Sequence, residues 1–247
     1  QDSLYTLGGF DNLKVLAVAG QKYGDIWGTK FRTVTDATSP FYGKRIVSSD
    51  GLPLATSDIY NLGNQQATGL LGVTNSFAWK GLNFSFLVDA RFGGKIFSGT
   101  NQAMQLAGTA AATAVGGNRD MMVLDAVTAS ANGEYTVNTK EVTPERYWST
   151  VAGTGNLGII EANIYDASNV RLRNVQVSYN LPSKFLTRTP FQKIKVGVSC
   201  NNVWLISSHL NGVDPESVFA TGTNAVGFEN VSPPTSRSVL FNLSLGF

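Results

Sequence analysis

Two carboxylates that could work as a pair, Asp214 and Glu216, lie in the run Gly-Val-Asp-Pro-Glu at residues 212–216. Glycosidases use two carboxyl groups that converge on one bond, one as general acid and the other as base or nucleophile. Glycine, proline and aspartate in one short run are also ordinary turn chemistry. A glycosidase is therefore one functional hypothesis, but we favour it least and expect that the chain is not an enzyme.

Other residues that support catalysis or metal binding are scarce. His209 is the single histidine, so neither a Ser-His-Asp triad nor a histidine zinc site can form without it, and nothing near it completes one. Cys200 is the single cysteine and cannot form an internal disulfide; it lies in a strand-like run where a small apolar residue would also fit. We expect no catalytic residue, no metal site and no cofactor.

Polar residues that could contact a ligand alternate with apolar ones along two segments. Leu82–Arg91 has apolar residues at every second position, with Leu87 as the exception, and Asn174–Asn180 alternates in the same way. Such alternation predicts strands with one apolar and one wet face. The candidate substrate contacts on the wet face are Asn83, Ser85, Asp89, Arg91, Asn174, Gln176 and Ser178. The alternative is a solvated face that binds no ligand.

Three further candidates lie in predicted loops: Tyr147, Trp148 and Asp214. Aromatic and aspartate side chains in loops suit contacts with a sugar or with a partner protein. The same residue types also occur as plain turn residues.

The composition limits the classes of protein that could position these residues. Of the 247 residues, 43% are hydrophobic and only 15% are charged, below the roughly 25% charge of ordinary soluble domains. The longest apolar stretches, such as Leu13–Ala19, are far too short for a membrane helix. The net charge of +2 includes no basic run, so we expect no nucleic-acid partner. Scarce charge with alternating strands is typical of a membrane β-barrel wall.

Further segments have strand patterns of a similar length. Leu70–Trp79 precedes Leu82–Arg91, and Lys80-Gly81 between them predicts a tight hairpin. Asn174–Asn180 stops at Leu181-Pro182 and is followed by a strand at Lys193–Trp204. The final strand lies within Ser236–Phe247. Weaker strand patterns occur at Ile26–Thr35 and Asn12–Ala19.

Short and long connections alternate between these strands. The short ones are Lys80-Gly81 and Leu181–Gln192, and the long ones are Asp36–Gly69, Phe92–Asn169 and Leu205–Thr235. Outer-membrane barrels have short periplasmic turns and long external loops. We therefore expect the long connections outside the cell, Phe92–Asn169 as a binding or gating loop, and Phe247 in the periplasm.

Aromatic residues lie at predicted strand ends, where barrels have aromatic girdles: Phe77, Trp79, Tyr179 and Phe247. Packing in an ordinary core is the alternative. A secreted β-sandwich adhesin or carbohydrate-binding module would also have short strands rich in Gly, Thr and Asn. The outward face discriminates the two, because a sandwich buries its apolar faces while a barrel exposes them to lipid.

Several stretches resemble, in order, the C-terminal part of the SusC/RagA family of TonB-dependent transporters from the Bacteroidota outer membrane. The segment from Val170 to Pro182, VRLRNVQVSYNLP, resembles that family's "lRLrNvtLgYnLP" strand and turn. Val196–Trp204 is similar to its "vsgqNlf" strand, and residues 212–216 resemble its "GvDPE" loop. Upstream resemblances lie in 23–28, 58–64 and 74–82, although Gln65 and Gln66 stand where the family often has a proline-containing pair.

The resemblance covers nearly the whole chain and is thinnest across Phe92–Gly155. It implies an all-β fold: an antiparallel transmembrane β-barrel segment of about six or seven strands from a plugged barrel of about 22 strands, with long extracellular loops. Residues 1–247 would form the C-terminal portion of that barrel. The plug and the remaining strands would lie outside this chain, and because Gln1 is not an initiator methionine, we expect a processed or internal piece.

The resemblance also implies a function and partners. Such transporters import glycans or peptides across the outer membrane with a SusD-like surface lipoprotein as a lid, driven by TonB acting on the plug. The expected partners are therefore the rest of the same barrel and plug, the lipoprotein, TonB through the plug, and outer-membrane lipid. An open sheet with unpaired edges in hydrocarbon would be prohibitively costly, so the chain must pair with the missing strands.

Overall fold

The computed structural model describes residues 4–219 and 222–247, so the first three residues, on which the expectation about the chain start rests, lie outside it. The chain divides into two compact units. The sheet unit consists of Ala67–Gly94, Ala167–Ser217 and Pro233–Phe247. The loop unit consists of the described residues of Gln1–Gln66, Lys95–Asp166 and Val218–Ser232.

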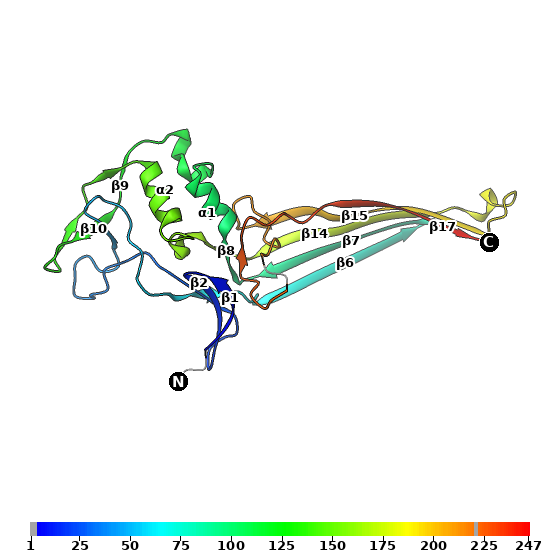
Figure 1. Cartoon of the computed structure of the whole chain (residues 1–247). Coiled ribbons are helices and arrows are strands. Elements are labelled where there is room, and N and C mark those ends of the chain that lie inside the picture. The colour runs from blue at the N-terminus through cyan, green and yellow to red at the C-terminus, as the bar shows by residue number, and fades with distance from the viewer. Residues whose placement is uncertain (1–3, 220–221) are drawn as a thin grey trace. The chain divides into compact units, whose positions relative to one another are not determined.

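The sheet unit contains one antiparallel five-stranded sheet with the strand order β17-β15-β14-β7-β6. Its long strands lie side by side in Figure 1. The strands are β6 Gly69–Trp79, β7 Leu82–Phe92, β14 Asn169–Asn180, β15 Lys193–Ser208 and β17 Ser238–Gly246. Each of the five coincides with a predicted strand, and β14 and β15 extend beyond the predicted ends.

The predicted hairpin between β6 and β7 is confirmed. Trp79 pairs with Leu82 across a two-residue turn in which Lys80 and Gly81 both have positive φ, at 45° and 89°. Such a turn matches the right-handed twist of its strands. A Cβ atom on Gly81 would lie 2.8 Å from the carbonyl oxygen of Asn180, so this position requires glycine.

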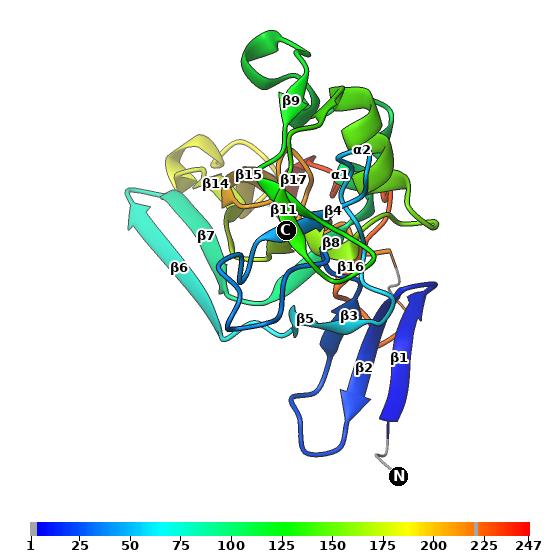
Figure 2. The ribbon, with the colours of Figure 1, turned by 90° about the vertical axis from the view of Figure 1, so that its left-hand side faces the viewer.

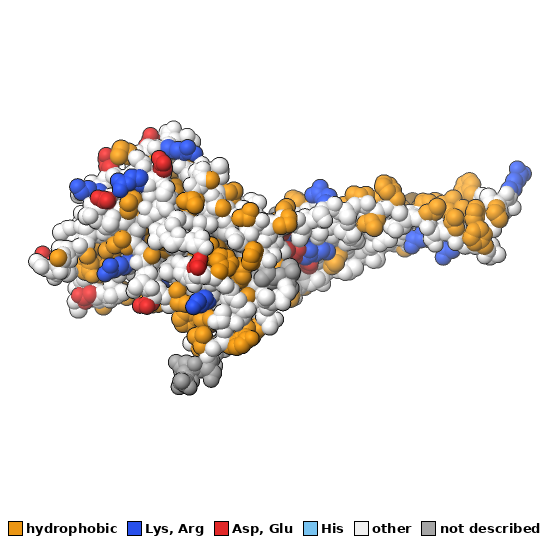
Figure 3. All heavy atoms as spheres, viewed as in Figure 1, with side chains coloured by type: hydrophobic (Ala, Val, Ile, Leu, Met, Phe, Trp, Pro, Cys, Tyr) orange, Lys and Arg blue, Asp and Glu red, His pale blue; other side chains and the backbone are white. Residues whose placement is uncertain are grey.

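One face of the sheet is apolar across all five strands. Directly opposed residues share a face, so the register Phe77–Phe84–Val177–Val198–Phe241 forms one apolar row. This face is exposed: the side chains of Phe241 and Trp79 are 82% and 69% accessible. In Figure 3, hydrophobic side chains gather along the part of the surface that the long strands form. A β-sandwich would bury this face, so the exposure argues against the sandwich hypothesis.

The opposite face is polar. The same register places Asn83 opposite Ser178, and Gly197 connects this row to Asn242. Within the described residues, β6 and β17 each pair with one neighbour only, so the sheet does not close on itself. It has five strands there, and the predicted six or seven barrel strands stay a prediction.

The two weaker predicted strands belong to the loop unit. Asn12–Ala19 contains β2 Leu13–Val18, and Ile26–Thr35 overlaps β3 Asp25–Gly28. With β1 Leu4–Phe10 and β5 Tyr60–Asn64 they form a four-stranded sheet of order β1-β2-β3-β5 (Figure 2). Strands β2 and β3 contribute most of the buried side chains of this sheet: Leu13, Val15 and Ile26 are inaccessible and pack with Phe97 and Ile160.

The predicted long external loop at Phe92–Asn169 is folded, not irregular. Its helices are α1 Gly99–Leu106 and α2 Pro144–Gly153, with short 3-10 turns at Ala111–Thr113, Val115–Gly117 and Ile160–Asn163. The remaining strands of the loop unit are β4 Arg45–Val47, β8 Lys95–Ser98, β9 Met122–Val123, β10 Ala126–Ala129, β11 Tyr135–Val137, β12 Glu141–Val142, β13 Ile164–Asp166 and β16 Phe228–Glu229. No helix within the described ranges has both the length and the apolar character needed to cross a membrane.

Candidate functional site

The predicted polar residues of β7 and β14 lie together on the polar face of the sheet. Asn83 pairs with Ser178 and Ser85 with Gln176 in adjacent rows, and these four residues line a hollow of about 280 Å³. The amide of Asn174 instead donates to Asn201 on β15 at 2.7 Å. The alternation of the sequence therefore predicted correctly that these residues share one face of the sheet.

Lys195 on β15 was missed by sequence reasoning. It lines the same hollow as Gln176 and Ser178, as well as a neighbouring one of about 480 Å³. No carboxylate of the described chain lies within ion-pair distance of its ammonium group. The sequence could have predicted this position, because Lys195 lies between the apolar residues Ile194 and Val196 and alternation therefore places it on the polar face.

Two arginines organise the other end of the same face. Arg173 binds Asp89 through Nε at 2.8 Å and binds Glu216 through both terminal nitrogens, at 2.7 and 2.6 Å. Arg171 binds Asp214 at 2.5 Å and donates to Thr235 at 3.0 Å. We call these side chains the arginine clamp, because they fasten the 212–216 run to β14. The predicted candidate Arg91 lies beside it, in a hollow of about 310 Å³ shared with Asp89, Arg173 and Glu216.

A bulge in β14 makes the clamp possible. The register shifts between Leu172 and Asn174, against both β7 and β15. Strand residues normally alternate between faces, so Arg173 and Asn174 would point to opposite sides of a regular strand. Because of the extra residue, the side chains of Arg171, Arg173 and Asn174 all lie on the polar face. Sequence alternation alone does not locate a bulge, so the clamp was not predicted.

The clamp keeps its loop carboxylates ionised. Burial raises the pKa of Asp214, but hydrogen bonds from Thr235 and the backbone of Glu216, together with Arg171, outweigh it and hold the pKa below its ordinary value. The hydrogen bonds from Arg173 lower the pKa of Glu216. A glycosidase needs one carboxyl group that is protonated at working pH. Asp214 and Glu216 do not meet that requirement, which argues against the glycosidase hypothesis.

The contacts of Asp214 are internal. Its side chain is 10% exposed, and that of Arg171 is 4% exposed. Besides Arg171, Asp214 accepts hydrogen bonds from the backbone nitrogens of Glu216 and Thr235, both at 3.0 Å. Asp214 therefore positions a loop, and this arrangement leaves little of it for contact with a partner or a sugar.

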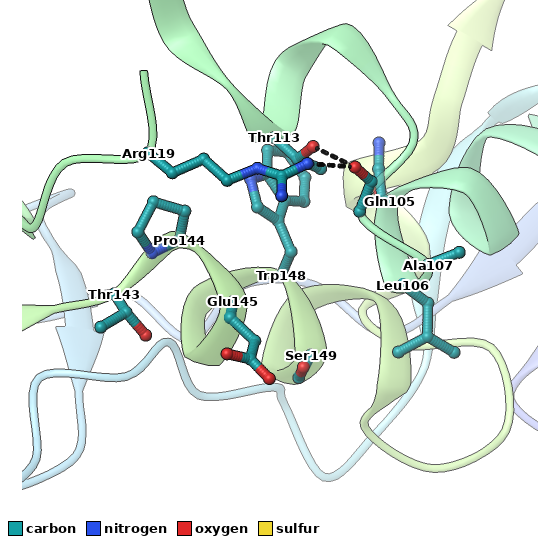
Figure 4. A pocket seen from close by; sticks show the side chains of 11 residues that line it. Gln105, Leu106, Ala107, Thr113, Arg119, Thr143, Pro144, Glu145, Trp148 and Ser149 are labelled. Atoms are coloured by element: carbon teal, nitrogen blue, oxygen red, sulfur yellow. Dashed lines mark hydrogen bonds between the residues drawn. The ribbon is translucent and has the colours of Figure 1, made fainter. Parts of the chain in front are cut away.

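The loop candidates Tyr147 and Trp148 lie on α2. Their rings meet edge to face, with centroids 5.0 Å apart, and both pack against the buried cluster of Phe31, Val151 and Ile159. Trp148 also lines a cavity of about 400 Å³ between the end of α1 and the start of α2 (Figure 4). Tyr147 is not part of that lining. The cavity is completed by side chains that sequence reasoning missed, among them Gln105, Thr113, Arg119, Glu145 and Ser149.

The charged side chains of the arginine clamp are paired with one another: Arg171 with Asp214, and Arg173 with Asp89 and Glu216. Within the described ranges no three histidine, cysteine, aspartate or glutamate side chains cluster as a metal site. The sheet has hollows on its polar face, and the loop unit has a mixed polar and aromatic cavity.

Comparison with known proteins finds a similar protein that is named as a TonB-dependent receptor. The chain is 24% identical over 246 residues to "TonB-dependent receptor P3" of Formosa agariphila, an alignment that covers 92% of this chain and 22% of the relative. No protein-family model matches the chain.

Solved structures share its fold. A chain of the RagAB peptide importer in the "closed-closed" state matches with a TM-score of 0.56 and 13% identity, over 94% of this chain and 24% of that one. A chain of the RagAB peptide transporter matches with a TM-score of 0.55 and 14% identity, over 99% of this chain and 24% of that one. This chain thus spans about a quarter of the length of the proteins it matches.

Both comparisons agree with the family resemblance that was noted in the sequence at residues 170–182 and 212–216. The chain is thus similar in sequence to a TonB-dependent receptor and in fold to chains of the RagAB peptide importer, as the resemblance to the C-terminal part of SusC/RagA transporters led us to expect.

Proposed function

We propose that this chain forms part of the wall and external loops of an outer-membrane, TonB-dependent nutrient importer. The two-faced sheet is the observation that carries this proposal. A wall between lipid and a water-filled lumen needs an apolar band on one side and polar residues on the other. The five long strands have this arrangement, with the apolar face exposed and not packed in a core.

The length of the strands fits a bilayer. Strand β7 has 11 residues, which at ~3.4 Å per step and a tilt of ~40° correspond to a height of about 26 Å, close to the ~25 Å apolar band of outer-membrane barrels. Aromatic residues occur at both ends of the apolar face: Trp79 and Tyr179 near the turns, and Phe92 and Trp204 near the long connections. Aromatic girdles have this placement.

The unpaired edges suggest what completes the wall. Among the residues that the structure describes, β6 and β17 each have one row of backbone donors and acceptors without a strand partner. In hydrocarbon such groups cost several kcal/mol each. We propose that further barrel strands of the same transporter pair with both edges, and that residues 1–247 are the C-terminal portion of its barrel.

The connections suggest the sidedness. The two connections at one end of the sheet are the Lys80-Gly81 turn and residues 181–192, while residues 93–168 and 209–237 connect strands at the other end. By the rule that turns are periplasmic and long loops external, the loop unit lies outside the cell and Phe247 at the periplasmic rim. A SusD-like lipoprotein would then contact the loop unit, and TonB would act through a plug. The polar candidates Asn83, Ser85, Asn174, Gln176 and Ser178 would face the transport lumen.

Tryptophan fluorescence in brominated lipid tests the wall directly. The chain has four tryptophans, of which Trp79 lies on the apolar face and Trp148 on α2. Single-tryptophan variants that retain one or the other, with phenylalanine elsewhere, are reconstituted in vesicles with brominated or ordinary acyl chains. We expect strong quenching of Trp79 by the brominated chains and none of Trp148. Equal emission of Trp79 in both lipids would refute the membrane wall.

A further inference from the structure

The charged side chains at one end of the five-stranded sheet are all basic. We call this end, formed by the Lys80-Gly81 turn, residues 181–192 and the adjoining strand ends, the turn end. Its charged residues are Lys80, Lys184, Arg188, Lys193 and Lys195. The acidic residues of the sheet unit, Asp89, Asp214 and Glu216, all belong to the arginine clamp at the other end. An end with charges of one sign attracts anions.

Backbone hydrogen bonds bring the two connections of the turn end together. The nitrogen of Asn180 donates to the oxygen of Gly81 at 2.8 Å. A short 3-10 turn at Ser183–Phe185 follows directly after Pro182, so Lys80 and Lys184 lie on neighbouring connections. On the face shown in Figure 3, the end of the sheet that carries the C label in Figure 1 has blue side chains and no red ones.

Three of these cations are exposed and lack a counter-charge. Lys80, Lys184 and Arg188 are exposed, and no carboxylate of the described chain lies within ion-pair distance of any of them. Lys193 and Lys195 differ, because alternation along β15 places both on the polar face. The first three are therefore the cations available to a ligand outside the lumen.

Two of the three cations lie over exposed aromatic rings. The Nζ of Lys80 is 5.1 Å from the centroid of the Trp79 ring, and the Nζ of Lys184 is 5.1 Å from that of Phe185. Both rings are exposed. An aromatic ring beside a long basic side chain fits the boundary between hydrocarbon and headgroups, where the ring stays near the acyl chains and the ammonium group reaches the phosphates.

The apolar face has a groove beside this boundary. Trp79 belongs to the row Trp79–Leu82–Tyr179–Val196–Leu243, which is the row of the apolar face next to the turns. The groove measures about 490 Å³, and its apolar side chains are Val177, Tyr179, Val196, Val198, Phe241 and Leu243. An acyl chain that lies in it buries apolar surface and has its headgroup at the turn end.

The combination of groove and cations restricts the partner. An acidic protein would neutralise the basic side chains but would leave the apolar groove uncovered. A zwitterionic lipid would fill the groove, but its own positive group offsets the attraction of its phosphate to the cations. A molecule with a net negative head and an apolar tail satisfies both features.

We propose that the turn end selects anionic phospholipid, with the headgroup phosphate bound by Lys80, Lys184 and Arg188 and an acyl chain in the groove beside Tyr179. This inference rests on the proposed function, because it takes the apolar face as lipid-facing, and it names the class of lipid at one rim. With the proposed sidedness, that lipid belongs to the leaflet that faces the periplasm.

The test uses the complete transporter that contains residues 1–247, with Trp79 as its single tryptophan and phenylalanine in place of the others. It is reconstituted in vesicles of equal parts phosphatidylglycerol and phosphatidylcholine, with bromine on the acyl chains of one lipid or the other. The ratio of the two quenching efficiencies gives the relative affinity of the lipids beside Trp79.

A basic side chain near an anionic surface contributes roughly fivefold to binding. We therefore expect the parent to prefer phosphatidylglycerol by at least about tenfold, and the triple variant Lys80→Gln, Lys184→Gln, Arg188→Gln by less than about twofold. If the triple variant is not recovered, Lys184→Gln alone carries the decision, with an expected loss of about fivefold.

The matched control is Arg237→Gln, which removes the same kind of charge from an exposed position next to the start of β17, at the other end of the sheet. It should keep the preference of the parent. The proposal is overturned if the parent shows no preference, if the triple variant or Lys184→Gln keeps the preference of the parent, or if Arg237→Gln loses as much as the triple variant. Equal quenching of Trp79 by both lipids overturns this proposal and leaves the membrane wall intact, whereas no quenching by either lipid refutes both.

Discussion

Arg173 donates hydrogen bonds to Glu216 through both terminal guanidinium nitrogens, at 2.7 and 2.6 Å. This contact links the loop at residues 212–216 to strand β14, 43 residues earlier in the chain. Bidentate pairs of this kind are both directional and strong. Together with the pair of Arg171 and Asp214, this contact defines how the 212–216 run lies on the polar face.

Breaking the buried half of the clamp should destabilise the protein. Asp214→Asn removes the nearer counter-charge of Arg171, whose side chain is 4% exposed, and leaves it only the longer pair with Glu216 at 3.6 Å. A cost of about 2 kcal/mol is expected from the lost charge-assisted hydrogen bond. The matched control is Asp125→Asn, which breaks the exposed pair with Lys44 and should cost under about 1 kcal/mol. Thermal unfolding followed by circular dichroism in detergent measures both. Equal melting temperatures for the two variants would contradict the clamp.

The clamp also predicts a dependence on acid. The pKa values of Asp214 and Glu216 lie below their ordinary values of 3.8 and 4.5. Depressed pKa values mean that the stabilisation is complete above the ordinary values and is lost as the pH falls through the folded-state values. The contribution of the clamp to the melting temperature should therefore be constant near neutrality and fall below about pH 4.5. Asp214→Asn with Glu216→Gln should show a shallower acid decline; an unchanged slope would contradict the assignment.

The two faces of the sheet predict opposite tolerance of charge. Val198 lies on the apolar face and its neighbour Ser199 on the polar one. Val198→Arg should cost about 2–4 kcal/mol if the face meets the middle of the bilayer, and should reduce the amount of protein recovered in the outer-membrane fraction. Ser199→Arg introduces the same charge one residue away and should be recovered normally. Comparable recovery of both variants would mean that the apolar face does not contact lipid.

The hairpin between β6 and β7 depends on one glycine. Gly81→Ala combines a φ of 89° with a Cβ atom 2.8 Å from the oxygen of Asn180, so a loss of about 2–3 kcal/mol is expected. Gly133→Ala is the control, because its φ of 83° is similar but nothing lies within 4 Å; it should lose only about 1 kcal/mol. Denaturant titration in detergent compares the two. A similar loss for both would show that the contact with Asn180 contributes nothing.

The sequence predicted those structural features that depend only on residues close together in the chain. Alternation located β7 because each residue of Leu82–Arg91 sees either one face or the other, and Lys80-Gly81 marked its turn because few residue pairs adopt two positive φ angles. The misassignment of Ile26–Thr35 has a physical reason as well. A strand that is buried on both sides lacks alternation. The sequence around Ile26 therefore did not show that this strand belongs to the small four-stranded sheet and not to the long five-stranded sheet.

The candidate site was predicted unevenly for the same reason. Asn83, Ser85, Gln176 and Ser178 share a face by period alone, and their meeting was predictable. The clamp depends on a bulge in β14 and on a distant loop, and neither has a local signature. The cavity between the end of α1 and the start of α2 brings Arg119 and Glu145 into one lining through the packing of two short helices, and no spacing in the sequence predicts that packing.

The short pairing of β8 with β13 has a consequence for how such a chain can vary. Lys95 stands opposite Asp166 and Phe97 opposite Ile164, and the backbone nitrogen of Ala167 donates to the oxygen of Gly94 at 3.0 Å. These bonds hold together the two ends of the long segment that connects β7 to β14. An insertion at the exposed turn beside Gly133 should therefore leave the recovery of membrane-inserted protein unchanged. The segment between β8 and β13 can therefore change in length and sequence during evolution while the pairing register of β7 and β14 stays the same.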